Sequence, residues 1–407
     1  MAVNIYRQGF PDSESLNGQG DLRVSQKYTQ FAGKFEFGLD HHRWRIKEVL
    51  GATVTYSTNE SAALLNVSNT IGSKAIMQSS WYIQYQPSHS SNNPMTFVAN
   101  SPVTGIRQRI GIFDDNNGLF LEINGLDVRF VIRSSTSGSP KDTPISQVDW
   151  NKQSFIKTHD IYKIDFSRGL LLIIDYLWQG FGEARFGFSL GGKPYYGHEA
   201  RNANVRNTVF MSTGTLPLRY EIENTGYSGT ATMKAVCAAS TSEGGSKLYG
   251  FQFVRDRAIT ALTSGYLPLI AIRPALLING KKNRGIVIPT SAAIILTGSS
   301  DLGQIQLIHN PTIVGGSWDA QGGTNPESII EYNISATSYS GGHIHDTDYI
   351  TSSQGGKPGS SFLPTIQTDI NLSINIDGDA ADTFLLVAKY ITGTPSIYAT
   401  LKWDEIY

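Results

Sequence analysis

Two histidines one residue apart are the sequence's clearest candidate for metal binding. His343 and His345 flank a single isoleucine, and Asp346 and Asp348 follow closely. In an extended strand, side chains two residues apart point to the same face, so the two imidazoles would project together. Imidazole nitrogens bind transition metals, and three copies in a trimer would supply six of them around one axis. The alternative is a polar glycine-rich loop that carries solvated histidines.

Oxygen-bearing side chains gather around a second segment. Asn375, Asp377, Asp379 and Asp382 lie close to Gly378. Hard cations need such oxygen clusters, but the spacing lacks the glutamate that completes a helix-loop-helix calcium site. An Asp-Gly pair is typical of a hairpin turn, which is the simpler interpretation. The sequence indicates no other cofactor.

Catalytic side chains are sparse. Glu221 and Glu223 would share one face of a strand, as the two carboxylates of a glycosidase do, although any β protein of this size contains such pairs. No Gly-x-Ser-x-Gly motif occurs, and the single cysteine, Cys237, has no histidine near it in the sequence. We expect Cys237 to be a buried apolar residue of a strand, and we expect no enzymatic activity.

Aromatic residues offer a different chemistry. Trp178, Tyr195 and Tyr196 belong to aromatic clusters that would stack on sugar rings or fill a subunit interface. The cores of β-sandwiches use the same residue types. Exposed aromatics would favour a glycan-binding protein, and buried ones would favour core packing.

Composition excludes several classes of protein. The 407 residues include 33 Lys and Arg and 34 Asp and Glu, for a net charge of -1, so binding to nucleic acid or to an anionic membrane cannot involve the whole surface. Apolar residues make up 40%, which excludes global disorder. A single cysteine excludes an intramolecular disulfide. The N-terminal residues lack the apolar core of a signal peptide, and no apolar run approaches the ~20 residues of a membrane span. We expect a soluble protein made in a cytoplasm.

The elements that must position these residues are strands. Glycine accounts for 41 residues and aromatics for 11%, and few segments run long enough for a helix without a breaker. Asp-Asn-Asn-Gly and Asn-Gly turns join three segments between residues 110 and 133 into an expected β-meander. Alternating or β-rich segments predict further strands at 52–58, 80–86, 162–166, 170–176, 184–190 and 219–223.

The amino-acid composition of the chain changes near residue 224, where Gly-, Ser- and Thr-rich stretches begin. We expect an all-β protein with an N-terminal arm at 1–35, an antiparallel sandwich of jelly-roll type at 36–224, and a second β-rich domain at 225–407. In this second domain, strict alternation of apolar and polar residues over 369–377 predicts a half-buried strand.

Seven segments carry a resemblance to known proteins: 79–87, 109–122, 130–135, 147–151, 177–188, 216–224 and 242–245. In the same order along the chain, they resemble a family of virion structural proteins from tailed bacteriophages, known mainly from aquatic phages and their relatives in large viruses. The similarity is collinear over residues 50–245 and weaker beyond. One segment departs from the family pattern, since Gln179 and Glu183 stand where the family has an apolar and a basic residue.

The resemblance implies a non-enzymatic component of a bacteriophage virion, made in the host cytoplasm, with the tail fibre, baseplate or adsorption apparatus favoured. It implies sister subunits in a trimer or hexamer and other virion proteins as partners, with a host surface glycan as a further one. Neither nucleic acid nor membrane insertion is expected. A lectin-like carbohydrate- or receptor-binding protein and a capsid decoration or head-fibre protein stay open as alternatives.

Overall fold

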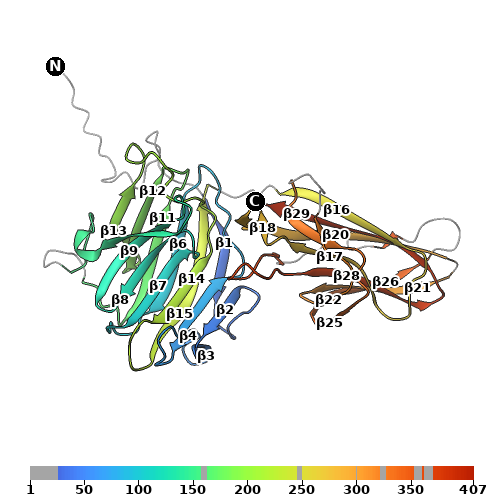
Figure 1. The fold of residues 1–407 in the computed structure, drawn as a ribbon, viewed down its shortest axis with the longest axis horizontal. Coiled ribbons are helices and arrows are strands. Elements are labelled where there is room, and N and C mark those ends of the chain that lie inside the picture. Colours follow the sequence, from blue (N-terminus) through green and yellow to red (C-terminus); the bar gives the residue numbers. More distant parts are fainter. Residues whose placement is uncertain are drawn as a thin grey trace, which may run out of the picture.

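The computed structural model describes residues 26–156, 163–244, 250–298, 300–320, 327–352, 360–361 and 370–407. These residues form two lobes side by side along the long axis of the molecule (Figure 1). Each lobe is built from packed β-sheets, and every strand pair among the described residues is antiparallel. The predicted all-β fold is therefore confirmed. Among these residues, no helix has the length and hydrophobicity that a membrane span requires.

The N-terminal lobe is a sandwich of two sheets. The first, of eight strands, has the order β13-β12-β11-β6-β15-β4-β3, with β1 also paired to β15. Its strands are β1 (Lys27–Lys34), β3 (Thr53–Ser57), β4 (Ala62–Val67), β6 (Ser91–Val98), β11 (Gly169–Tyr176), β12 (Glu183–Leu190), β13 (Lys193–Arg201) and β15 (Ala231–Glu243). The second, of seven strands, has the order β10-β9-β8-β7-β14-β5-β2. Its strands are β2 (Trp44–Val49), β5 (Lys74–Ser79), β7 (Ile106–Phe113), β8 (Gly118–Asn124), β9 (Asp127–Ser134), β10 (Lys141–Ser146) and β14 (Leu218–Asn224).

Alternation of side chains along the strands builds the core between these two sheets. On β14, Leu218, Tyr220 and Ile222 point inward and are buried in one continuous apolar cluster with residues of both sheets. Phe97 of β6 and Trp44 of β2 are fully buried in the same cluster. Because the side-chain period of a strand is two, the residues between these apolar positions must face outward.

The expected meander is confirmed as β7, β8 and β9, and most of the other expected strands of this lobe also form. The segment 80–86 is an exception, since only Ile83 makes an isolated bridge, to Leu216. This segment carries the chain from β5 in one sheet to β6 in the other, so it cannot pair continuously with either. The described part of 162–166 is also not a strand, because Asp165 accepts hydrogen bonds from the backbone and hydroxyl of Ser167 and starts a turn.

The eight-stranded sheet includes strands that precede and follow the range 36–224 expected for the sandwich. β1 lies within the segment interpreted as an arm, and β15 lies beyond residue 224, in the Gly-, Ser- and Thr-rich stretch. β15 carries a bulge between Ala235 and Cys237 in its pairing with β6. The bulge reverses the facing of the residues that follow it, so Cys237 is exposed. The prediction of a buried Cys237 was therefore wrong, because uninterrupted alternation was assumed.

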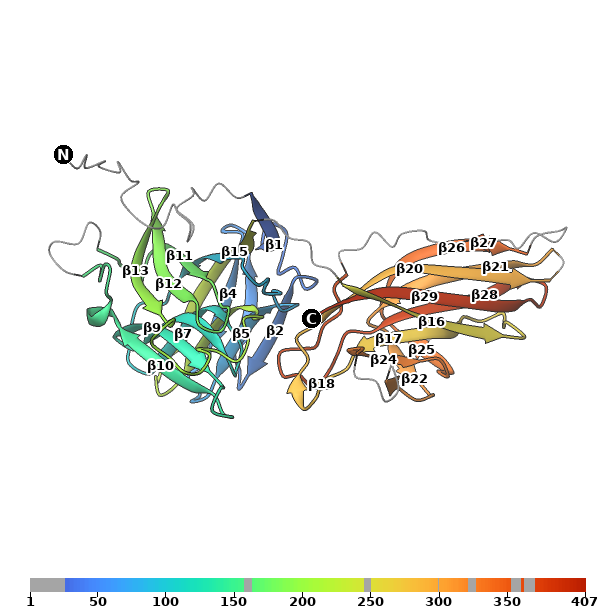
Figure 2. The same ribbon diagram turned by 90° about the horizontal axis from the view of Figure 1, so that it is seen from above.

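The C-terminal lobe contains a four-stranded sheet of order β16-β29-β20-β27 and a six-stranded sheet of order β23-β24-β17-β28-β21-β26, both visible from above in Figure 2. A second apolar cluster, which includes Trp403 and Leu386, fills the space between them. The four-stranded sheet contains β16 (Phe251–Ile259), β20 (Ile286–Thr297), β27 (Ser360–Ser361) and β29 (Ser396–Ile406). The six-stranded sheet contains β17 (Leu267–Pro274), β21 (Leu302–His309), β23 (Asp319–Ala320), β24 (Ile330–Asn333), β26 (His343–Thr351) and β28 (Phe384–Thr392).

Two small two-stranded sheets complete this lobe: the hairpin of β18 (Leu277–Ile278) with β19 (Lys281–Lys282), and the pairing of β22 (Thr312–Val314) with β25 (Ser338–Ser340). The predicted half-buried strand at 369–377 is reduced to isolated bridges at Leu372 and Ile374, and its first residue lies outside the described ranges. The described part of this segment runs through the junction between the lobes, where its polar residues bind the other lobe.

Charged and polar contacts connect the two lobes. Arg45 of β2 donates to Asp382, and Lys47 forms an ion pair with Asp377. Further along the junction, Arg284 of the C-terminal lobe donates to the buried carboxylate of Asp114 through Nη2 at 2.7 Å and Nε at 3.1 Å. Two charge-assisted anchors at separate points fix the angle between the lobes better than one contact does.

Histidines also meet at this junction. The rings of His42 and His343 lie 6.0 Å apart, and His343 is the cross-strand partner of His309 on β21. Burial lowers the pKa of His309. The charges of His42, Arg45 and His345 lower it further, and Asp382 opposes them. His42 and Arg45 belong to the N-terminal lobe, so contact between the lobes contributes to the lowered pKa of His309.

We expect the lobes to separate on acidification. A histidine pKa held below its ordinary value favours docking above about pH 6.5, and this contribution is lost as the pH falls below that value. Small-angle X-ray scattering should give a larger radius of gyration at about pH 5 than at about pH 8. His309→Gln should reduce this difference, and His41→Gln, at a neighbouring exposed position, should not. Equal radii for the wild-type protein at both pH values would contradict the prediction.

Candidate functional site

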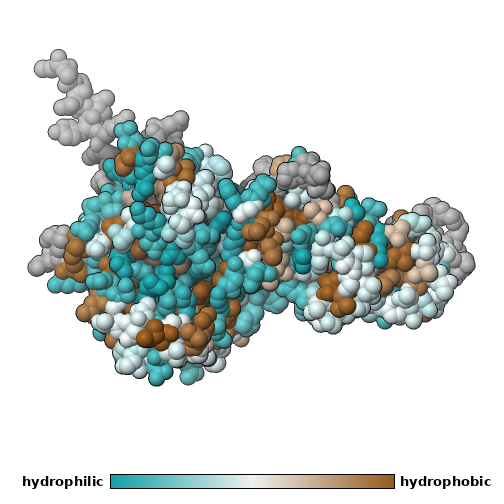
Figure 3. Space-filling view, viewed as in Figure 1, coloured by the Kyte–Doolittle hydropathy of each residue, from teal (hydrophilic) through white to brown (hydrophobic). Residues whose placement is uncertain are grey.

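The outward side of the seven-stranded sheet carries rows of alternating charge, and we call this surface the polar face. One row consists of Lys74, Glu223 and Arg107, which are cross-strand neighbours on β5, β14 and β7. The next row runs over β14, β7, β8 and β9 through Glu221, Arg109, Glu122 and Arg129. Opposite charges on directly paired strand positions attract one another. Figure 3 shows that hydrophilic residues dominate this side of the N-terminal lobe.

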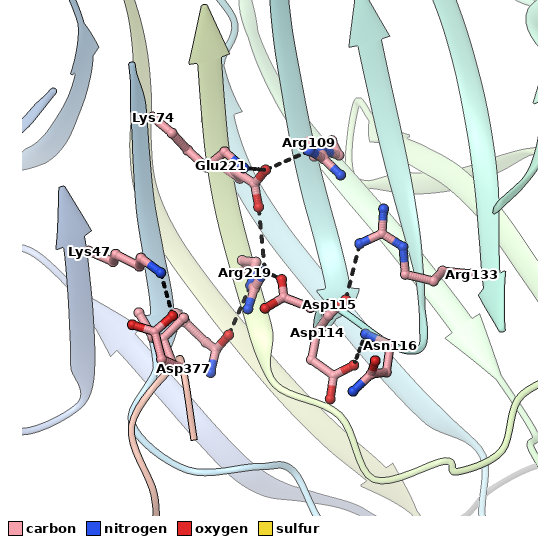
Figure 4. Close-up of polar contacts among 12 residues, drawn as sticks. Lys47, Lys74, Arg109, Asp114, Asp115, Asn116, Arg133, Arg219, Glu221 and Asp377 are labelled. Carbon is pink, nitrogen blue, oxygen red and sulfur yellow. Dashed lines mark hydrogen bonds and ion pairs between the residues drawn. The ribbon is translucent and has the colours of Figure 1, made fainter. Parts of the chain in front are cut away.

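At the centre of the polar face, charged groups are buried. The Arg219 side chain is 0% exposed and that of Glu221 only 3%, and Arg219 Nη1 lies 3.4 Å from Glu221 Oε2. Arg219 also donates to Asp115 at 2.7 Å and to Gln78 at 2.9 Å. Gly111 is the cross-strand partner of Arg219, and a Cβ there would lie 2.3 Å from the carbonyl oxygen of Leu119. Figure 4 shows Arg219 and Glu221 pointing toward one another from β14.

Neighbouring ion pairs extend this network. Arg109 Nη2 lies 2.7 Å from Glu221 and 3.3 Å from Glu223, so one guanidinium binds both carboxylates of the pair singled out in the sequence. Arg133 of β9 binds Asp142 of β10 through two bonds of 2.7 and 2.9 Å. The guanidiniums of Arg133 and Arg219 also lie over the rings of Phe120 and Phe113, at 5.1 and 5.2 Å.

Nearby cations keep the carboxylates of Glu223, Asp142 and Asp115 ionised. Burial alone would raise the pKa of Glu223, but the hydrogen bond and charge of Arg107, with Lys74 and Arg109, lower it. Asp142 shows the same balance, in which the hydrogen bond and charge of Arg133 overcome burial and lower its pKa. The charge and hydrogen bond of Arg219 likewise overcome burial and lower the pKa of Asp115. The polar face therefore presents fixed negative and positive charges at neutral pH.

A cavity of about 390 Å³ opens on the polar face, and we call it the polar cavity. Its wall contains three cationic and three anionic side chains together with a proline. The lining residues are Lys74, Arg109, Asp115, Arg133, Pro140, Asp142 and Glu221. This volume lies in the range of small-molecule sites.

A larger hollow of about 1140 Å³, the interlobe cleft, lies between the lobes. The β7–β8 turn separates the two hollows, since Asp115 lines the polar cavity and Asn116 and Asn117 line the cleft. The β9–β10 connection likewise gives Pro140 to the cavity and Gly138 to the cleft. The C-terminal lobe contributes the β18–β19 hairpin to the far wall.

The histidines expected to bind metal lie at one end of β26. His343 faces His309 across the strand pair, and His345 occupies a bulge, because Leu307 pairs with Asp346 and Ile308 with Ile344. The bulge interrupts the alternation that the sequence interpretation assumed. Within the described ranges of a single chain, no group of three or more His, Cys, Asp or Glu side chains is placed to hold a metal ion. A site shared by three subunits stays a prediction.

The aromatic candidates are partly buried. Trp178 packs against the core of the N-terminal lobe and donates its indole N–H to the carbonyl of Met211 at 3.0 Å. Tyr195 also packs against this core. The Tyr196 ring lies 5.5 Å from the Arg185 guanidinium, and its hydroxyl lies 3.4 Å from Asp175. Their stacking on sugars stays a prediction, and none of them lines the polar cavity.

The oxygen cluster forms a turn. Asn375 accepts hydrogen bonds from the backbone N–H groups of Gly378 and Asp379, as in an Asx-type turn. Asp377 and Asp382 bind the N-terminal lobe through Lys47 and Arg45. The hairpin-turn interpretation therefore describes the geometry, with interlobe contact as an additional role.

Sequence reasoning identified Glu221 and Glu223 as a pair but did not link their strand, β14, with β7, which carries Arg109. They lie more than a hundred residues apart in the chain and meet because β7 and β14 are neighbours in the sheet. Both segments carry a pair of charged residues at alternate positions, basic in β7 and acidic in β14. This matching pattern is the signal that could have linked them. Asp142 carried no such signal, because its strand, β10, is mostly exposed and polar.

No protein-family model matches the chain, and no curated protein matches it. Similar solved structures include the carbohydrate recognition domain of an Emp46p mutant, with 11% identity over 55% of this chain and 100% of that chain, and a TM-score of 0.36. A legume lectin-like domain from Entamoeba histolytica shares 11% identity over 52% of this chain and 97% of that chain, with a TM-score of 0.32. A glycosyl hydrolase family 16 protein from Mycobacterium smegmatis shares 16% identity over 52% of this chain and 100% of that chain, with a TM-score of 0.32. Scores at this level carry no functional argument, which must come from the chain's own residues.

The buried charge network predicts a large effect of one substitution. Arg219→Ala should destabilise the protein by about 3–5 kcal/mol, because it leaves buried carboxylate charge without its partner. Denaturation in urea measures the change. Arg168→Ala is the matched control, since that side chain is 83% exposed and should change stability by less than about 0.5 kcal/mol. A double variant, Arg219→Met with Glu221→Leu, should recover most of the lost stability. Equal stability of Arg219→Ala and Arg168→Ala would contradict the prediction.

Proposed function

We propose that the protein is a non-enzymatic, carbohydrate-binding protein that holds an uncharged sugar in the polar cavity. The observation that supports this proposal most directly is the equal number of cationic and anionic side chains in the wall of the cavity. The cations are Lys74, Arg109 and Arg133, and the anions are Asp115, Asp142 and Glu221. A sugar hydroxyl both donates and accepts hydrogen bonds, so it finds partners of both kinds there. An anionic ligand would meet three carboxylates, and a cationic ligand would meet three cations.

The wall is also held in place before any ligand arrives. Arg133 is bound to Asp142 by two bonds, and Arg109 to Glu221 and Glu223. Side chains that are already ordered lose little conformational freedom on binding. Hydrogen bonding to fixed charged groups, without an aromatic platform, is the form of recognition that this cavity offers.

The paired carboxylates favour binding over hydrolysis. A glycosidase needs one carboxyl group whose pKa is raised, so that it can protonate the leaving group. The pKa of Glu223 is instead lowered, chiefly by Arg107 against the effect of burial. Glu221 lies within 2.7 Å of Arg109. Both candidates are thus held by cations, and we expect no turnover of a bound glycan.

The setting of this binding activity rests on the sequence resemblance alone. A place in a bacteriophage virion, in the tail or on the head, stays a prediction, as does assembly into trimers or hexamers. Carbohydrate binding would suit such a particle, and it does not depend on that setting.

Asp142→Ala should abolish or weaken glycan binding at least tenfold, because it removes an acceptor from the wall and releases the side chain of Arg133, which Asp142 holds by two hydrogen bonds. The full chain is first tested on an array of neutral and acidic oligosaccharides, and the neutral oligosaccharides it retains are then titrated by calorimetry. Asp142 is 40% exposed, so the fold should tolerate the change.

Lys234→Ala serves as the matched control, because its ion pair with Glu60 is similarly exposed and lies on the other sheet. It should bind as the wild-type protein does. Tyr196→Ala provides a third arm: loss of binding there but not in Asp142→Ala would transfer the site to the aromatic cluster. Chromatography of the incubated oligosaccharides should detect no new reducing ends; conversion that disappears in Glu223→Gln would refute the non-enzymatic proposal.

A further inference from the structure

The interlobe cleft differs in charge from the polar cavity. Its charged lining residues are Lys281, Lys282 and Arg284, and none of the residues that line it, all of them within the described ranges, is an aspartate or glutamate. Most of the other lining side chains are amides and hydroxyls, such as Gln84, Asn279 and Thr215.

Not all three cations are equally available. Arg284 is neutralised by Asp114, which it binds through two nitrogens. Lys282 donates to the backbone carbonyl of Ile376 at 2.7 Å, a neutral acceptor. Burial lowers the pKa of Lys282, and the nearby Asp114 and Asp115 oppose this effect. Lys281 is exposed. The two lysines therefore supply the positive charge that an incoming ligand would meet.

A short hairpin carries these lysines. β18 and β19 are joined by Asn279 and Gly280, which have φ values of 50° and 73°. An Asn-Gly pair with two positive φ angles is typical of the tight turn that matches the twist of paired strands. Figure 2 places β18 beside the junction of the lobes, with the N-terminal lobe opposite. Both lysines, carried on β19, line the cleft.

We infer that the interlobe cleft is a second binding site, which takes an acidic polysaccharide, with Lys281 and Lys282 contacting its carboxylate groups. The hydroxyl and amide walls provide partners for the sugar hydroxyls between the acidic groups. The volume of about 1140 Å³ exceeds the usual range of small-molecule pockets, which gives room for a segment of a polymer. This site goes beyond the proposed function and does not depend on the polar cavity.

A nucleic acid fits the cleft less well. Proteins that bind single strands combine a cationic groove with several aromatic platforms, whereas Tyr407 is the one aromatic lining residue of this cleft among the described residues. Two lysines also neutralise few phosphates. The walls therefore favour a polymer recognised through hydroxyl groups.

Calorimetry of the full chain with polygalacturonate tests the inference, with dextran as the neutral polymer. Polygalacturonate should bind, more weakly as salt is added, and dextran should not compete for it. Lys281→Gln should weaken binding about tenfold. Lys282→Gln should do the same, whereas Lys282→Arg should retain binding because the charge is kept. Lys193→Gln, which removes an exposed lysine on β13, is the matched control and should bind as the wild type does.

Three outcomes would overturn the inference: no binding of polygalacturonate by the wild-type protein, binding unchanged in Lys281→Gln, or tighter binding of a single-stranded oligonucleotide than of polygalacturonate. Asp142→Ala separates this site from the proposed function. That variant should lose the neutral glycan and keep polygalacturonate, so either site can fail without the other.

Discussion

The pairing of β7 with β14 is the constraint on which the rest of the N-terminal lobe depends. It places the buried Arg219 and Glu221 beside Arg109, where each charge has a partner. A shift of one residue in this register would turn the charges into the apolar core and expose the residues that fill it. An isolated buried charge is costly, so the network specifies one register more strongly than the apolar residues alone would. The shape of the polar cavity follows from that register.

The same face also holds the second lobe. Arg45 lies on β2 and binds Asp382, while Asp114 at the β7–β8 turn binds Arg284. Charged residues of the N-terminal lobe thus bind the second lobe, and the interlobe cleft depends on these contacts. Both hollows share the β7–β8 turn and the β9–β10 connection as walls. A change in the angle between the lobes would therefore alter the cleft before the polar cavity. The second lobe contributes a wall to the cleft and none of the residues that line the polar cavity.

Local patterns in the sequence predicted the fold class and many strands, since alternation and Asn-Gly turns act over a few residues. The meander of β7, β8 and β9 is the clearest case. The failures have physical causes: the segment 80–86 has strand composition but crosses between sheets, and the bulge in β15 reversed the facing of Cys237. For the site, the sequence identified Glu221 and Glu223 as a pair but not their arginine partners, because strand order in a sheet depends on contacts between distant segments.

The exposed thiol of Cys237 has a practical consequence. It is the only cysteine in the chain, and it lies on β15, in the eight-stranded sheet, whereas the polar face belongs to the seven-stranded sheet. A maleimide fluorophore attached there would mark every molecule once, on the opposite layer of the sandwich from the polar cavity. Two copies could be joined by oxidation only where these outer surfaces meet. The native chain therefore carries its own reporter of self-association, without any engineered residue.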